Sequence, residues 1–231
     1  MSRTRTGIYG GTFNPIHLGH LQAAEAVADQ LGLARVVFIP SGRPPHKHAN
    51  DPADPIADPA LRLSWVRDAI AGNPRFEVSP LEVEREGPSY LVDTLAEIRR
   101  ERVGERIVFL LGRDAFADLG NWREPRRLLT LADFAVTTRP PETGGDLRDW
   151  LPDCVRDDVE LTPDGKVAIH REARTRIELV DIHALDVSAT DVRARARAGE
   201  PLHHLVPERI CEAIEHSGVY TNRSTTDAEV K

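Results

Sequence analysis

Two histidines three residues apart follow a pair of glycines near the start of the chain, in the segment GGTFNPIHLGH at residues 10–20. A β-rich run predicts a strand over residues 6–9, and apolar residues at helical spacing predict a helix over residues 17–31. Adjacent glycines let the backbone turn tightly and approach a phosphate, and the first turn of a helix offers N–H groups to an anion. His17 and His20 would share one face of that turn and could donate hydrogen bonds to a reacting phosphate. The plainer alternative is two polar residues at a helix start, one of them a cap.

The elements that must position these residues alternate along the chain. Further strands or extended segments are predicted at residues 36–39, 76–83, 106–111, 133–138 and 177–182. Further helices are predicted at residues 60–71, 89–102, 189–198 and 207–216. This alternation predicts an α/β fold with a doubly wound, mainly parallel sheet, helices on both faces and two helices at the C-terminal end. Ligands of such sheets bind at the carboxyl ends of the strands.

Three segments interrupt this pattern. Residues 42–59 contain five prolines and predict a loop. Periodicity fades between residues 140 and 176, which predicts an insertion with minor structure of its own. The polar tail at residues 221–231 is predicted to be disordered. Residues 1–220 would then form a single domain.

Composition narrows the classes of function. The 231 residues carry a formal charge of -7, which argues against a broad basic surface for nucleic acid. The only cysteines, Cys154 and Cys211, lack the spacing of a zinc site or a disulfide framework. No apolar run reaches the length of a membrane span, and no apolar signal region opens the chain, so we expect a cytoplasmic protein without a membrane partner.

The motif at residues 10–20 resembles the signature of the HxGH nucleotidyltransferase superfamily. Four further segments follow in the matching order: PSGRPPHK (40–47), PSYLVDTL (88–95), LGRDAF (111–116) with Trp122 after it, and VSATDVR (187–193). Together they resemble the bacterial nicotinate-nucleotide adenylyltransferases over about residues 6–220. The resemblance implies a Rossmann-like nucleotidyltransferase domain that joins ATP and nicotinate mononucleotide, giving nicotinate adenine dinucleotide and pyrophosphate in NAD biosynthesis.

The resemblance also implies roles for individual residues. The implied catalytic residues are His17, His20, Lys47 and Arg193. The implied ATP-binding residues are Gly10, Gly11, Thr12, Phe13, Ser188 and Thr190. The implied substrate-binding residues are Tyr90, Leu91, Thr94, Gly112, Asp114, Trp122 and Arg123. Of these, Asp114 would contact the ribose, and Trp122 would contact the pyridine ring. The cofactor would be Mg²⁺ held mainly by the ATP phosphates, since no cluster of carboxylates suggests a protein metal site.

Several alternatives stay open at this point. Ser188 and Asp191 also have the form of a helix capping box, Trp122 could be a core residue, and Lys47 could be a solvated loop lysine. The sequence departs from the family pattern at Leu91, where threonine is usual, at Ala189, which lacks a hydroxyl group, and at Asn14, where aspartate is frequent.

Other functions also compete. The acceptor could be nicotinamide mononucleotide, phosphopantetheine or another phosphate, and a regulator could keep the pocket without catalysis. A dinucleotide-binding oxidoreductase is disfavoured, because the first turn lacks GxGxxG. The sequence does not fix the oligomeric state.

Overall fold

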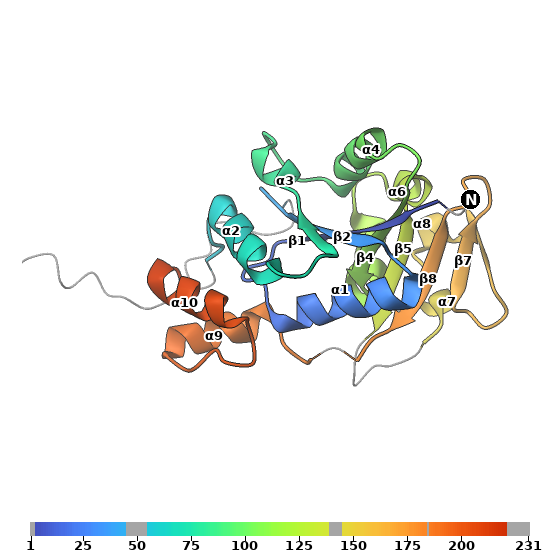
Figure 1. The fold of residues 1–231 in the computed structure, drawn as a ribbon. Coiled ribbons are helices and arrows are strands. Elements are labelled where there is room, and N and C mark those ends of the chain that lie inside the picture. The colour runs from blue at the N-terminus through green and yellow to red at the C-terminus, as the bar shows by residue number, and fades with distance from the viewer. Residues whose placement is uncertain (1–2, 45–54, 139–144, 184, 221–231) are drawn as a thin grey trace, which may run out of the picture.

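An eight-stranded sheet forms the centre of the computed structural model, which describes residues 3–44, 55–138, 145–183 and 185–220 (Figure 1). The strands are β1 (Arg5–Gly11), β2 (Arg35–Pro40), β3 (Phe76–Val78), β4 (Arg106–Gly112), β5 (Asp133–Thr138), β6 (Val159–Leu161), β7 (Val167–His170) and β8 (Arg176–Asp181). The helices are α1 (Leu18–Leu31), α2 (Pro59–Ile70), α3 (Leu81–Glu84), α4 (Leu91–Glu101), α5 (Arg113–Ala117), α6 (Pro125–Leu131), α7 (Leu147–Trp150), α8 (Asp153–Arg156), α9 (Ala189–Ala198) and α10 (Glu208–Ser217), with a 3₁₀ turn at Asp118–Asn121.

The strand order is β3-β2-β1-β4-β5-β8-β7-β6. All pairs from β3 to β8 are parallel, and β7 and β6 extend the sheet in antiparallel fashion. The chain therefore starts in the middle of the sheet, builds outward through β2 and β3, and then returns to build the other half from β4. Strand order reverses between β1 and β4, and open α/β sheets bind ligands at the carboxyl ends beside such a reversal.

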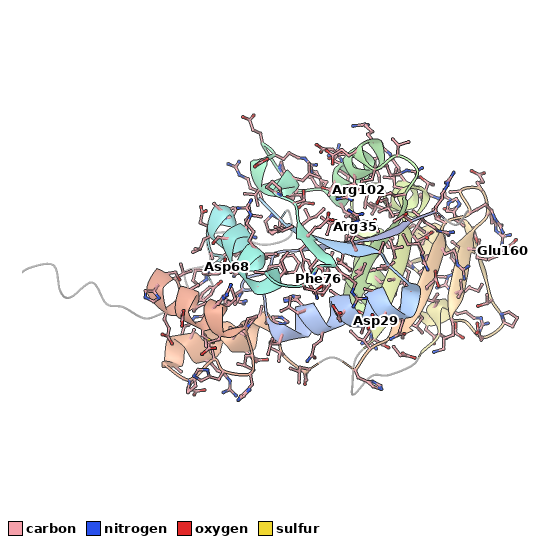
Figure 2. The ribbon with its side chains drawn as sticks, viewed as in Figure 1. Asp29, Arg35, Asp68, Phe76, Arg102 and Glu160 are labelled. Atoms are coloured by element: carbon pink, nitrogen blue, oxygen red, sulfur yellow. The ribbon has the colours of Figure 1, made fainter. Side chains whose placement is uncertain are left out.

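Alternate residues of each central strand face opposite sides of the sheet, as a strand requires. Val36, Phe38, Val108 and Leu110 pack on the side covered by α1, α2, α9 and α10. Residues 37, 39, 107, 109 and 111 pack on the other side with α4 and α6. Side chains fill the space on both sides of the sheet (Figure 2). At its β3 edge Arg35 and Arg102 both pair with Glu77, at 2.8 and 3.1 Å.

The predicted fold class is confirmed, including the two C-terminal helices, which end at left-handed Gly199 and Gly218. The extended prediction over residues 76–83 is wrong in its second half, where α3 begins at Leu81. The first strand extends beyond the predicted residues 6–9, because Gly10 and Gly11 pair with β2 inside β1.

The poorly patterned stretch contains regular structure from residue 145 onward: α7, α8, β6 and β7. Its status as an insertion in a single domain stays a prediction, and the predicted disordered tail lies outside the described residues. Within the described residues, no helix combines the length and apolar character needed to cross a bilayer.

Candidate active site

Two pockets open on either side of the carboxyl end of β1. The first, of about 320 Å³, is called the histidine pocket here; of the predicted site residues it is lined by His17, His20, Gly112, Asp114 and Ser188. The second, of about 210 Å³, is called the tryptophan pocket; of the predicted site residues it is lined by Gly10, Gly11, Thr12, Tyr90, Leu91, Trp122 and Arg123. Twelve predicted residues thus gather around the strand reversal.

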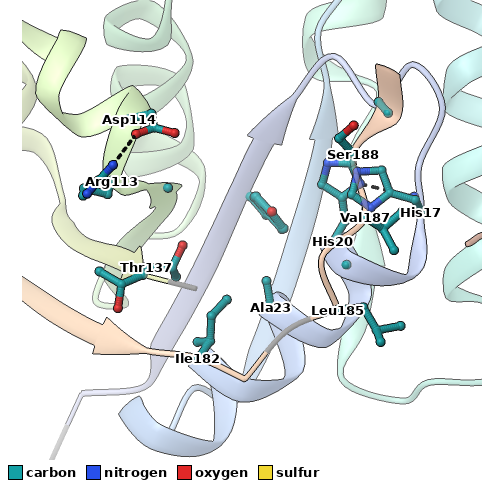
Figure 3. A pocket seen from close by; sticks show the side chains of 15 residues that line it. His17, His20, Ala23, Arg113, Asp114, Thr137, Ile182, Leu185, Val187 and Ser188 are labelled. Atoms are coloured by element: carbon teal, nitrogen blue, oxygen red, sulfur yellow. Dashed lines mark hydrogen bonds and ion pairs between the residues drawn. The ribbon is translucent and has the colours of Figure 1, made fainter. Parts of the chain in front are cut away.

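The two histidines form a stacked pair at the start of α1. His17 is the N-cap residue with an extended backbone, and its N–H donates to His20 Nδ1 at 3.2 Å. The ring centres lie 3.6 Å apart (Figure 3). Because His20 Nδ1 accepts this hydrogen bond, the neutral ring carries its proton on Nε2, which becomes its donor. A fixed donor at a helix N-terminus suits a phosphate oxygen.

Gly19, between the two histidines, was not singled out by the sequence analysis. A Cβ at this position would lie 3.1 Å from His17 Nδ1 and 3.3 Å from the Leu185 carbonyl oxygen. Both approaches are tight, so the residue between the histidines must be small if His17 is to keep its place.

The neighbouring loop is packed by aromatic rings. A Cβ on Gly11 would lie 3.1 Å from the Phe13 ring, and one on Gly10 would lie 3.2 Å from the Phe109 ring. Phe13 itself has a left-handed backbone (φ 47°), is 2% exposed, and lies 5.1 Å from the His20 ring between centres. Phe13 therefore supports His20 from the core, so its contact with ATP can come only through its backbone.

Arg193 faces the back of this loop. Its Nη1 donates to the Asn14 carbonyl at 2.8 Å and its Nη2 to the Thr190 hydroxyl at 3.2 Å, and the residue is 6% exposed. Thr190 and Arg193 therefore contact each other, and Arg193 also holds the loop after β1 through Asn14. Their contact with phosphate stays a prediction.

Asn14 departs from the family pattern and is also a structural residue. It is 4% exposed, its Oδ1 accepts from the Ala57 N–H at 2.9 Å and from the Tyr220 hydroxyl at 2.5 Å, and its Nδ2 donates to the Pro55 carbonyl at 3.1 Å. An amide can serve both donors and acceptors here, whereas a carboxylate could only accept.

The far end of the histidine pocket is formed by the turn after β4. Figure 3 shows Arg113 and Asp114 there, opposite the histidines and Ser188. Arg113 Nη2 lies 3.2 Å from Asp114 Oδ1. Arg113 was missed, although its place between Gly112 and Asp114 at a strand end was a usable signal.

Ser188 caps α9, as the alternative interpretation allowed. Its Oγ accepts from the Asp191 N–H at 3.1 Å and donates to Asp191 Oδ2 at 2.6 Å. Ser188 and Ala189 both line the histidine pocket, so the first turn of α9 faces the same space as the first turn of α1.

The tryptophan pocket joins an aromatic ring to a helix N-terminus. Trp122 is half-buried and its Nε1 donates to Asp118 at 3.3 Å. Tyr90 is the N-cap residue of α4, and the Arg123 guanidinium lies 4.7 Å from its ring centre. N–H groups of a first helical turn together with a nearby guanidinium favour a bound carboxylate.

Thr94 lies below this pocket in a buried network. It is 1% exposed, donates to Glu82 Oε1 at 2.7 Å, and accepts from Arg85 Nη1 at 2.8 Å. Burial raises the pKa of Glu82, against the lowering effects of its hydrogen bonds with Thr94 and Ser89 and of the Arg85 charge. Glu82 lines the pocket and was missed, because a glutamate in a charged segment carries no signal of burial.

Lys47 lies outside the described residues, so its contact with ATP stays a prediction. Among the described residues, no group of three or more His, Cys, Asp or Glu side chains is arranged to hold a metal ion.

The family model of cytidylyltransferase-like proteins matches residues 8–195, which is most of the chain. The chain therefore belongs to this family.

Relatives within the family are more specific. A protein of Desulfitobacterium hafniense, named "Probable nicotinate-nucleotide adenylyltransferase", is 38% identical over 94% of this chain and 95% of its own length. A protein of Moorella thermoacetica with the same name is 40% identical over 95% of this chain and 93% of its own length. The resemblance inferred from the motifs is confirmed.

A solved structure shares the fold. The nicotinic acid mononucleotide adenylyltransferase of Plasmodium falciparum, complexed with NaAD, matches with a TM-score of 0.69 at 14% identity, over 94% of this chain and 97% of that one.

Proposed function

We propose that this chain transfers the adenylyl group of ATP to nicotinate mononucleotide, giving nicotinate adenine dinucleotide and pyrophosphate. The observation that carries the proposal is the pair of pockets beside β1, one with two histidines and two helix N-termini, the other with Trp122 and the N-terminus of α4. Adenylyltransferase relatives at 38–40% identity support the same assignment.

The reaction needs no covalent intermediate on the protein. A phosphate oxygen of the acceptor attacks the α-phosphorus of ATP, the bond from that phosphorus to the bridging oxygen breaks, and pyrophosphate leaves with the electron pair. The nucleophile is already an anion at neutral pH, so the protein has to align the reactants and stabilise charge. The His20 Nε2 proton, His17, and the first turns of α1 and α9 would serve the ATP phosphates.

Mg²⁺ would neutralise charge on the phosphates when bound. The pocket residues fit an ion held mainly by substrate oxygens and water, as Mg²⁺ accepts few protein ligands in such sites. Among the described residues that line the histidine pocket, Asp114 is the one carboxylate. We propose that it binds the ribose hydroxyls and does not hold the ion. A cytoplasmic location stays a prediction.

The acceptor is assigned from the tryptophan pocket. The pyridine ring would stack on Trp122, and the nicotinate carboxylate would meet the first turn of α4 near Arg123. Leu91 can serve there through its backbone N–H, so the loss of a threonine side chain does not remove the site. Nicotinamide mononucleotide is the second candidate, since it offers the same ring without the negative charge.

The test is pyrophosphate release from ATP and Mg²⁺ with nicotinate mononucleotide, with the dinucleotide identified by chromatography. We expect release only when both substrates are present, in equal amounts to the dinucleotide. Pyrophosphate without dinucleotide, or ATP binding without any release, would contradict the proposal.

A further inference from the structure

Arg62, in the first half of α2, is fully buried, and among the described residues no carboxylate accepts a hydrogen bond from its side chain. The residue is 0% exposed. Its Nε donates to the Ala57 carbonyl at 2.9 Å, its Nη1 to the Thr12 carbonyl at 2.6 Å, and its Nη2 to the Ser41 and Gly42 carbonyls at 2.7 and 3.4 Å. Within the described part of the chain, every acceptor is a neutral backbone oxygen.

Two electrostatic effects disfavour a guanidinium at this position. Burial of a cation costs free energy unless an anion compensates, and burial lowers the pKa of Arg62, against the raising effects of Tyr220 and Asp58. Arg62 also lies four residues after the N-cap Asp58, at the positive end of the helix dipole. A core position on α2 could instead hold an apolar side chain, so the guanidinium requires an explanation beyond packing.

The acceptors of Arg62 belong to both loops that follow the central strands β1 and β2. Thr12 lies in the loop after β1, which carries two of the predicted ATP-binding residues, Thr12 and Phe13, and leads to His17. Ser41 and Gly42 open the loop after β2, which leads to Lys47. The start of the β2 loop also meets the end of β1 directly, since the Ser41 N–H donates to the Gly11 carbonyl at 2.9 Å. One guanidinium therefore fixes the position of both loops at once, which its planar fork of five donors allows.

The contacts also fix which way the peptide groups face. In a trans peptide the C=O and the next N–H point in opposite directions. The Thr12 carbonyl points to Arg62, so the Phe13 N–H points away from it. The β2 loop shows the same arrangement. The Ser41 and Gly42 carbonyls point to Arg62, and the N–H groups that follow them, of Gly42 and Arg43, donate to Ser89 Oγ at 3.1 and 3.2 Å. Ser89 in turn lines the tryptophan pocket.

We infer that Arg62 is a positioning residue for nucleotidyl transfer: it holds the β1 loop so that the Phe13 N–H faces the ATP phosphates, and it sets the spacing of the β2 loop from them. The inference rests on the proposed function for the reaction it serves. Arg62 does not touch substrate, and its effect passes through Thr12, Ser41 and Gly42.

The test compares Arg62→Lys and Arg62→Ala with Arg67→Ala, which removes an exposed arginine from the same helix. A lysine keeps the charge but has only three donors and no planar fork, so it cannot serve the four carbonyls in fixed directions. We expect Arg62→Lys to lose about 10²-fold in kcat and to raise the KM for ATP, as a misplacement of about 1 Å does. Arg67→Ala should match the unaltered protein.

Chemical rescue separates positioning from stability. Guanidinium ion at a non-denaturing concentration should restore turnover to Arg62→Ala, and urea at the same concentration should not. Circular dichroism establishes which variants are folded at the assay temperature, and Arg62→Lys, the milder change, decides the outcome if Arg62→Ala is unfolded.

Folded Arg62→Lys with unaltered kcat and KM for ATP would overturn the inference. A failure of the proposed function gives a different pattern: the unaltered protein would itself form no dinucleotide. In that case ATP binding, measured by calorimetry, still decides the role of Arg62, because equal dissociation constants for the unaltered protein and Arg62→Lys would overturn it.

Discussion

At the residue scale, the tautomer of the neutral His20 ring follows from one hydrogen bond. Its Nδ1 accepts the His17 N–H, so its Nε2 is left as the donor. We expect His20→Ala to lower kcat by about 10²-fold or more, since a single lost oxyanion donor has that effect elsewhere. Stopped assays of pyrophosphate release measure it, and His203→Ala, which changes an exposed histidine, is the matched control. Turnover of His20→Ala within a few-fold of the control would remove His20 from the mechanism.

We expect substitution of Trp122 to weaken binding of the acceptor and not of ATP. Stacking of a base on an aromatic ring contributes about 1–3 kcal/mol, so Trp122→Ala should raise the KM for nicotinate mononucleotide by roughly 5- to 150-fold. Trp122→Phe should retain most of the affinity, and the KM for ATP should stay unchanged in both. Equal effects on the two substrates would instead indicate a core role for Trp122, the alternative that the sequence left open.

We expect Glu82 to make the free energy of unfolding depend on pH. Burial raises its pKa above the ordinary value of 4.5, so the folded state holds this proton more tightly than the unfolded state. The stabilising contribution is present below pH 4.5 and is lost as the pH rises through the folded pKa. Urea denaturation of Glu82→Gln should therefore show its free energy of unfolding increasing, relative to the unaltered protein, from pH 4.5 to pH 7.5.

The control for that series is Glu84→Gln, which changes an exposed glutamate on the same short helix. Its difference from the unaltered protein should not change over this pH range. A constant difference for Glu82→Gln as well would show that Glu82 ionises in the folded protein as it does in the unfolded chain.

At the element scale, the C-terminal part of the chain holds the loop after β1. Arg193 of α9 and Tyr220, after α10, both contact Asn14, which lies near the other end of the sequence. Tyr220→Phe removes one donor from Asn14 Oδ1 but leaves the Ala57 N–H in place. We expect a loss of about 0.5–1.5 kcal/mol in the free energy of unfolding.

A double-mutant cycle with Asn14→Ala measures the same contact. The coupling energy between Tyr220→Phe and Asn14→Ala should equal most of the single loss, because the two side chains are in direct contact. Additive effects would mean that the hydroxyl contributes nothing through Asn14.

At the scale of the whole molecule, the parallel half of the sheet could be predicted because its strands are buried on both faces. Residues 36–39 and 107–111 are continuous apolar runs, and such runs are typical of central parallel strands. The glycines after α9 and α10 marked both helix ends. The short antiparallel strands β6 and β7 were not predictable, since three or four residues cannot show a period.

The site was predictable where neighbours in sequence act together and not where distant segments meet. His17 and His20 share a helical turn, so their spacing was sufficient. The partnership of Arg193 with Asn14 spans 179 positions, and that of Arg62 with Thr12 spans 50. Such contacts depend on how the layers pack, and no local sequence pattern predicts that. Through this packing both arginines donate to backbone carbonyls inside the protein.

The most direct test of the account is one competition reaction with ATP, Mg²⁺ and equal concentrations of nicotinate and nicotinamide mononucleotides. The ratio of the two dinucleotides, resolved by chromatography at early times, equals the ratio of the kcat/KM values. We expect an excess of the nicotinate product, because the first turn of α4 and Arg123 favour a carboxylate. Equal products, an excess of the nicotinamide product, or no product at all would contradict it.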